Sequence, residues 1–158
     1  MILSACLVLL LAAAAVWDFA ALRIPNPLTL GLVALCALRA LADPLHFPWL
    51  EHLAAGLAVF LVTLGLFHFR LIGGGDLKLL TGTALWLGLG GLPAHLVLVA
   101  LSGAALALLL LAARPLVWPL LARLPMAAAP WIPRALEPGA GVPYGVPIAL
   151  SAIVLAMR

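Results

Sequence analysis

Six long apolar runs, separated by short stretches rich in proline, glycine or charge, constrain the fold of this chain most strongly. The runs are Ile2 to Trp17, Leu28 to Ala42, His52 to Phe69, Leu77 to Leu92, His95 to Ala113 and Pro143 to Met157. Only 8% of the residues are charged and the mean hydropathy is +1.31, whereas a water-soluble domain has about a quarter charged residues. Because a spanning helix takes about 20 residues, we predict an all-α integral membrane protein with about six transmembrane helices.

The positions of the basic residues predict the orientation of these spans. Six of the eight lie in the loops after the first, third and fifth runs or at the start of the fourth: Arg23, Arg70, Lys78, Arg114, Arg123 and Arg134. Because basic loops stay in the cytoplasm, we predict that these loops are cytoplasmic and that the N-terminus lies outside. The first run lacks the basic start of a secretory signal peptide, so we expect it to be retained as a span.

A single polytopic domain over residues 1–158, with no separate soluble domain, suits this pattern. Residues 114–142 contain six prolines, which should prevent a long helix. Together with Trp118 and Trp131, the prolines predict a loop that lies along the membrane interface.

Metal, cofactor and nucleic-acid sites are not expected. Cys6 and Cys36 lie alone in apolar runs, and neither has a Cys or His at the spacing of metal ligands. The basic residues are scattered and do not form the patch with interleaved aromatic residues that nucleic-acid binding requires.

Two of the five acidic residues adjoin a span. Asp18 follows the first run and Asp76 opens the fourth, so the predicted topology places both at the cytoplasmic face. An acidic side chain at bilayer depth costs about 2.5–3.5 kcal/mol and is a candidate functional residue. Each acid also has a structural explanation, since Asp76 could cap a helix and Asp18 could mark the end of a span.

As a pair, the two acids suggest a specific chemistry. Two nearby carboxyl groups share one proton. The ionised group can then take a proton from water while the protonated group polarises a carbonyl. This is acid–base hydrolysis of a peptide bond without a metal or a nucleophilic side chain.

Gly73, Gly74 and Gly75 directly precede Asp76. Glycines permit backbone angles that other residues avoid and let a substrate strand approach closely. The alternative is a flexible linker.

Three motifs, in this order, resemble those of the prepilin peptidases. Asp18, followed after five residues by Ile24-Pro25-Asn26-Pro27, resembles the first aspartate motif of that family. Residues 73–80 (Gly-Gly-Gly-Asp-Leu-Lys-Leu-Leu) resemble its Gly-x-Gly-Asp-x-Lys-Leu motif. Residues 142–149 (Val-Pro-Tyr-Gly-Val-Pro-Ile-Ala) are similar to the closing Pro-Tyr-Gly segment of the short forms found in tight-adherence (Flp) pilus systems.

The resemblance implies a multi-pass aspartic endopeptidase of the bacterial cytoplasmic (inner) membrane. Its substrates would be type IV or Flp prepilins or pseudopilins, cut at the cytoplasmic face after a glycine that precedes their hydrophobic helix. The resemblance also implies that Asp18 and Asp76 are catalytic. Further residues are implied for substrate binding or loop geometry: Pro25, Asn26, Gly73, Gly74, Gly75 and Lys78.

Long members of that family also methylate the new N-terminus of the prepilin and carry paired cysteines in an N-terminal cytoplasmic region. This chain starts directly in its first apolar run and has no cysteine pair. We therefore expect peptidase activity without methyltransferase activity.

Two alternatives remain at this stage. One is a small polytopic transporter that uses Asp18 and Asp76 as ion or proton sites, and the other is a non-enzymatic pilus-assembly subunit that tolerates Asp76→Asn. Neither accounts for the glycines together with the spacing of Asp18 and Ile24-Pro25-Asn26.

Overall fold

The computed structural model describes residues 2–121, 123 and 132–157, which are mostly helical and contain no strand. The elements are α1 (Ile2–Ala21), α2 (Asn26–Ala42), α3 (Trp49–His68), α4 (Gly74–Leu121), the short 3₁₀ helix η1 (Arg134–Leu136) and α5 (Gly145–Ala156). Three of them, α1, α3 and α4, are long and apolar enough to cross a membrane, while α2 and α5 are shorter apolar helices. The prediction of an all-α membrane protein is confirmed.

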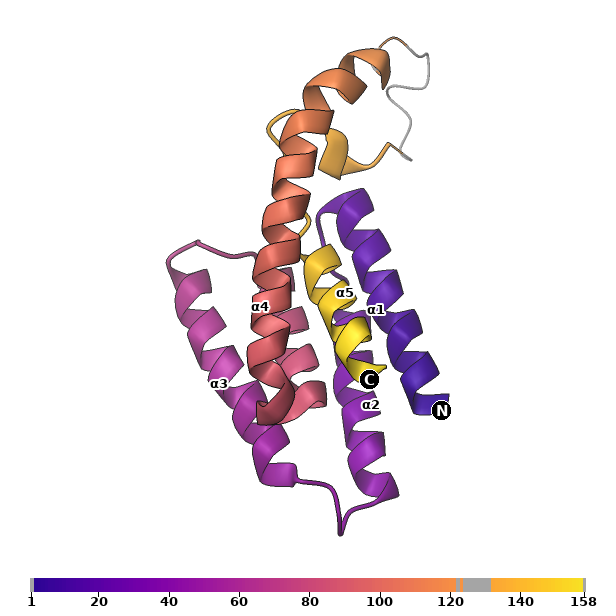
Figure 1. The fold of residues 1–158 in the computed structure, drawn as a ribbon, viewed down its shortest axis with the longest axis vertical. Coiled ribbons are helices and arrows are strands. Elements are labelled where there is room, and N and C mark those ends of the chain that lie inside the picture. Colours follow the sequence, from indigo (N-terminus) through magenta and orange to yellow (C-terminus); the bar gives the residue numbers. More distant parts are fainter. Residues whose placement is uncertain (1, 122, 124–131, 158) are drawn as a thin grey trace.

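Helix α4 consists of two antiparallel arms. At Gly88 the backbone leaves helical geometry, with φ 68° and ψ −178°. Thr83 Oγ1 lies 2.9 Å from His95 Nε2, although twelve residues of a straight helix would cover about 18 Å. The chain therefore reverses at Gly88, between a first arm (residues 74–87) and a second arm (residues 89–121), as Figure 1 shows at the lower end of α4. With these two arms, each of the six apolar runs forms an α-helical segment among the described residues.

The reversal lies four residues before the predicted end of the fourth run at Leu92. Pro93 is consequently the fifth residue of the second arm. There its missing N–H removes one backbone hydrogen bond near the start of that arm.

The first arm is short, since fourteen residues cover about 21 Å and a bilayer core measures about 30 Å. Its last carbonyl groups are satisfied by side chains from α2 and α3. The carbonyl of Leu85 accepts hydrogen bonds from His52 Nδ1 at 2.7 Å and from Cys36 Sγ at 3.3 Å. The carbonyl of Trp86 accepts one from Arg39 Nη1 at 3.3 Å. Because unpaired backbone groups are costly in lipid and cations favour helix C-termini, these contacts stabilise the reversal.

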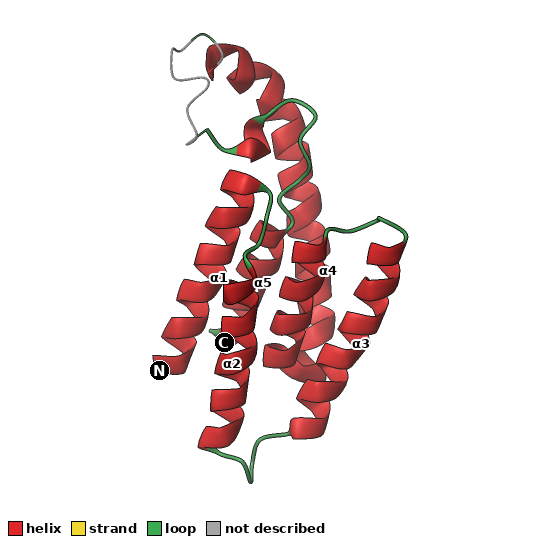
Figure 2. Cartoon of the chain, turned by 180° about the vertical axis from the view of Figure 1, so that it is seen from behind, coloured by secondary structure: helices red, strands yellow, loops and turns green. Residues whose placement is uncertain are grey.

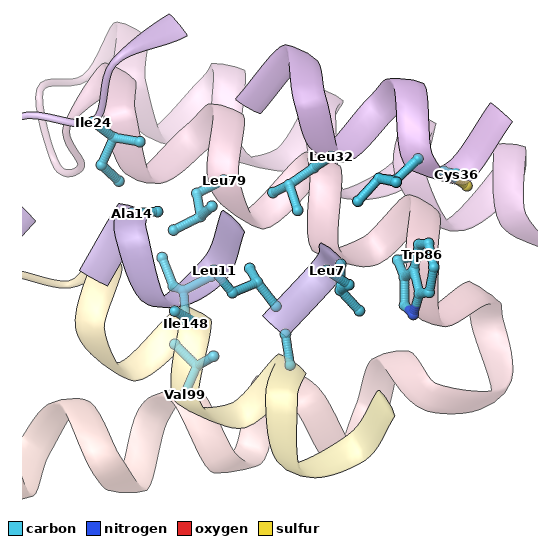
Figure 3. Close-up of a cluster of buried hydrophobic side chains, with 13 residues drawn as sticks. Leu7, Leu11, Ala14, Ile24, Leu32, Cys36, Leu79, Trp86, Val99 and Ile148 are labelled. Carbon is cyan, nitrogen blue, oxygen red and sulfur yellow. The ribbon is translucent and has the colours of Figure 1, made fainter. Parts of the chain in front are cut away.

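The apolar core joins α1, α2, both arms of α4 and α5 (Figure 3). Its largest fully buried members are each at most 1% exposed: Leu7, Leu11, Leu32, Leu79 and Ile148. The outward faces of the helices also carry many exposed leucines and valines. A bundle that is apolar both inside and outside is expected of a protein solvated by lipid.

The helix ends that carry Asp18 and Asp76 meet at one end of the bundle. The C-terminal ends of α1 and α3 lie there with the N-terminal ends of α2, α4 and α5, while the N-terminus and the α2–α3 loop lie at the other end (Figure 2). The basic loop residues Arg23 and Arg70 therefore gather at the end that carries the aspartates, as the charge pattern indicated. The orientation of this end toward the cytoplasm stays a prediction.

Helix α4 persists through Pro115 and Pro119 to Leu121, although the proline content predicted that helix would end near Ala113. Each of these prolines removes only one backbone hydrogen bond. The helix bends in this last part (Figure 1). Arg114 connects it to η1 by donating a hydrogen bond of 2.9 Å from Nε to the carbonyl of Ala135. Residues 122 and 124–131 of the predicted interfacial loop, including Trp131, lie outside the described residues.

Candidate active site

Asp18 lies in the last turn of α1 and is only 5% exposed. Its Oδ2 accepts a hydrogen bond of 2.7 Å from the backbone N–H of Gly145, the first residue of α5. The N-terminus of a helix carries partial positive charge and unpaired N–H groups, so it is a favourable place for a carboxylate. A residue far along the chain thus fixes the carboxyl group of Asp18.

Gly145 is required for this contact because a side chain would occupy the space of Asp18. A Cβ at position 145 would lie 2.8 Å from Oδ2 and 2.9 Å from Cβ of Asp18. The motif around Gly145 was visible in the sequence, but its contact with Asp18 was not predicted. A glycine at the start of a helix, where it lowers helix propensity, was the available signal.

The preceding Tyr144 packs against a second glycine. A Cβ at Gly103, in the second arm of α4, would lie 2.8 Å from the ring of Tyr144. Gly145 allows close contact with α1 and Gly103 allows close contact with α4, so the Pro143-Tyr144-Gly145 segment passes closely between these two helices.

Asp76 lies in the first turn of α4, directly after the three glycines. A Cβ at Gly73 would lie 3.2 Å from Asp76 Oδ2, and a Cβ at Gly75 would lie 3.3 Å from Cβ of Ile24. Gly73 therefore leaves room for the carboxylate, and Gly75 lets α4 begin against the segment before α2. At Gly74 a Cβ would make only an ordinary contact with the ring of Phe67.

The three glycines do not use the backbone angles that the sequence argument invoked. Among the described residues, the glycines with positive φ are Gly88 and Gly139. In this structure Gly73 and Gly75 allow close approach of Asp76 and Ile24. The close approach of a substrate strand stays a prediction.

Asp18 and Asp76 line one cavity of about 310 Å³ at the end of the bundle. Residues 22–24, residues 73–75 and Lys78 form the rest of its wall. The charges of the two carboxyl groups interact, although the residues are far apart in sequence. The cavity thus combines two acidic groups, a glycine-rich wall and space for water and a peptide segment.

Lys78 joins the two aspartate motifs. Its Nζ donates a hydrogen bond of 2.9 Å to Oδ1 of Asn26, at the start of α2. Pro25 precedes that start in an extended conformation, with φ −62° and ψ 137°. This contact gives Lys78 a role that the sequence did not reveal, which is to tie the start of α4 to the start of α2 beside the cavity.

Leu22, in the wall of the cavity, has a strained backbone with φ 51°. Its N–H donates to the carbonyl of Asp18 at 2.8 Å and so closes the end of α1. A left-handed conformation costs a residue other than glycine about 1–3 kcal/mol, and such strain tends to occur at functional sites. The turn directs the chain from Asp18 to the wall at Ile24.

Among the residues that the structure describes, no three His, Cys, Asp or Glu side chains are grouped as metal ligands would be.

Comparison with protein-family models matches residues 5–108 to the type IV leader peptidase family. This range covers more than half of the chain and contains Asp18, Pro25, Asn26, residues 73–76 and Lys78. It ends before the segment that carries Gly145. Searches of curated proteins and of solved structures gave no match.

Proposed function

Because the chain belongs to the type IV leader peptidase family, and is therefore a peptidase of prepilin-type substrates, we propose that it is an aspartic endopeptidase. It removes the leader peptide from type IV or Flp prepilins at the cytoplasmic face of the bacterial inner membrane, as a multi-pass protein. The observation that carries this proposal is the cavity lined by both Asp18 and Asp76 at the end of the bundle where the basic loops gather.

In the proposed mechanism, the two carboxyl groups share one proton. A water molecule between them loses a proton to the ionised carboxylate and attacks the scissile carbonyl carbon. The protonated carboxyl group donates a hydrogen bond to the carbonyl oxygen and stabilises the negative charge that develops there. The proton taken from water then passes to the leaving amine. Gly145 holds Asp18 in position throughout, through the 2.7 Å hydrogen bond.

The glycine-rich wall supports the same function. Gly73 leaves the Oδ2 of Asp76 without a neighbouring side chain on that side. An extended substrate backbone could therefore approach the carboxylate closely. The tight-adherence type of substrate is proposed from the Pro-Tyr-Gly segment, whose glycine contacts Asp18 in this structure.

The test is co-expression with a prepilin, followed by a gel shift that separates precursor from mature pilin. Asp18→Asn and Asp76→Asn keep the size of each side chain but remove its acid–base function, and each should lower leader removal by at least about 10²–10⁴-fold. Asp43→Asn is the matched control, because Asp43 is exposed and pairs with His46 in the α2–α3 loop. Wild-type cleavage by both cavity variants would contradict the proposal.

The family match gives no support to a transporter or a non-enzymatic assembly subunit. A transporter would produce ion flux in reconstituted vesicles and leave a prepilin uncut. An assembly subunit would retain its function after Asp76→Asn.

A further inference from the structure

A groove of about 370 Å³ lies beside the candidate active site. Helices α2 and α3 form its two sides and the first arm of α4 forms its floor, since α2 and α3 each pack on α4 and not extensively on each other. Figure 2 shows α2 and α3 on either side of α4. The sides include Leu30 and Val33 of α2 and Phe60 of α3, all exposed apolar residues.

The floor of the groove is made of small residues. Thr81 and Gly82 lie on it, beyond Leu77 and Lys78. The hydroxyl of Thr81 donates to the carbonyl of Leu77 at 2.8 Å, so the floor presents little unpaired polarity. Small residues in membrane helices allow another helix to approach closely.

The groove adjoins the cavity of the aspartates. Lys78 lines both, and its hydrogen-bond partner Asn26 lines the groove. Thr81 follows Asp76 by five residues, which is about 7.5 Å along the helix. The groove therefore runs from the acidic cavity toward the apolar interior of the bundle.

We propose that the apolar helix of a prepilin docks in this groove, between α2 and α3 and against Thr81 and Gly82. This proposal rests on the proposed function. The groove adjoins the cavity at Lys78, so a helix in the groove would end beside Lys78 and Asn26. The polar segment that precedes the helix would then reach Asp18 and Asp76. A lipid chain would also fit an apolar groove, but it has no need to end at the acids.

Two substitutions that fill the groove test the proposal. Thr81→Leu places a larger side chain on the floor, and Val33→Phe places a larger side chain on one side, at an exposed position. Each variant is assayed with a full-length prepilin and with a short peptide that contains the leader and the scissile bond but no apolar helix. We expect KM for the prepilin to rise by about tenfold, kcat to remain nearly constant and cleavage of the peptide to be unchanged.

Leu108→Phe is the control, because Leu108 is an exposed residue of the second arm that lies outside the groove. Unchanged KM for the prepilin in both groove variants would overturn the proposal, since a substrate helix in the groove would meet the larger side chains. Equal losses with prepilin and peptide would also overturn it, since the effect would not depend on the substrate helix. Cleavage of both substrates by Asp76→Asn would instead contradict the proposed function.

Discussion

Gly145→Ala should disturb Asp18 without changing any acidic group. The new Cβ would lie 2.8 Å from Oδ2, 2.9 Å from Cβ and 3.0 Å from Cγ of Asp18. Two of these atoms belong to the base of a buried side chain, so rotation of the carboxylate alone cannot relieve the overlap. Either α5 shifts away from α1 or the whole side chain turns aside. Both movements break the 2.7 Å hydrogen bond from the backbone of residue 145.

The size of the effect follows from the lost contact. A hydrogen bond to a charged group contributes about 1.5–3 kcal/mol, and about 1.4 kcal/mol corresponds to a tenfold change in rate. We therefore expect leader removal to slow by about 10- to 100-fold, measured as the initial rate of the gel shift at equal amounts of enzyme. Gly65→Ala is the matched control, because a Cβ on that glycine of α3 would meet nothing within 4 Å.

A wild-type rate for Gly145→Ala would refute the argument that the start of α5 positions Asp18. The comparison with Gly65→Ala removes the general effect of adding a methyl group to a helix. Because rates are compared at equal amounts of protein, a lower yield of the variant cannot imitate the expected result.

The remaining predictions concern two hydrogen-bonded pairs outside the acids. Lys78→Ala and Asn26→Ala should each slow cleavage. The double variant should be no slower than the slower of the two single variants, because both remove the same 2.9 Å hydrogen bond. Additive losses in the double variant would contradict this. His95→Leu removes hydrogen bonds to Thr83 at 2.9 Å and to Ser151 at 2.8 Å. At about 0.6 kcal/mol for each such bond in a membrane protein, the free energy of unfolding should fall by about 1 kcal/mol in a detergent titration, and an unchanged unfolding curve would disprove the estimate.

The helical segments and the common location of the acids could be predicted because both depend on simple sequence properties. Apolar runs of sufficient length must be helical in lipid. The alternation of basic and poorly charged loops assigns each helix end to one side. Asp18 and Asp76 adjoin helix ends on the same side, so they were expected at one depth in the membrane. In the structure both residues line one cavity.

Features that depend on contacts distant in sequence could not be predicted. The contact of Gly145 with Asp18 requires α5 to lie beside α1, which no local pattern specifies. The partner of Lys78 is Asn26, at the start of a different helix. The fourth run was predicted to end at Leu92, whereas the chain reverses at Gly88. Apolar residues continue past this turn, where side chains of α2 and α3 satisfy the last carbonyl groups of the first arm.

A buried network connects the supports of the two acids. His95 is fully buried and bonds through Nε2 to Thr83, in the arm whose first turn contains Asp76. It bonds through Nδ1 to Ser151, in the helix whose first residue, Gly145, donates to Asp18. A neutral imidazole donates from one nitrogen and accepts at the other, and each hydroxyl group can take either role, so both bonds can form without a charge. Sliding of α5 against the first arm would change the distance between the carboxyl groups and would break one of these bonds. The network therefore opposes the displacement that would separate the acids.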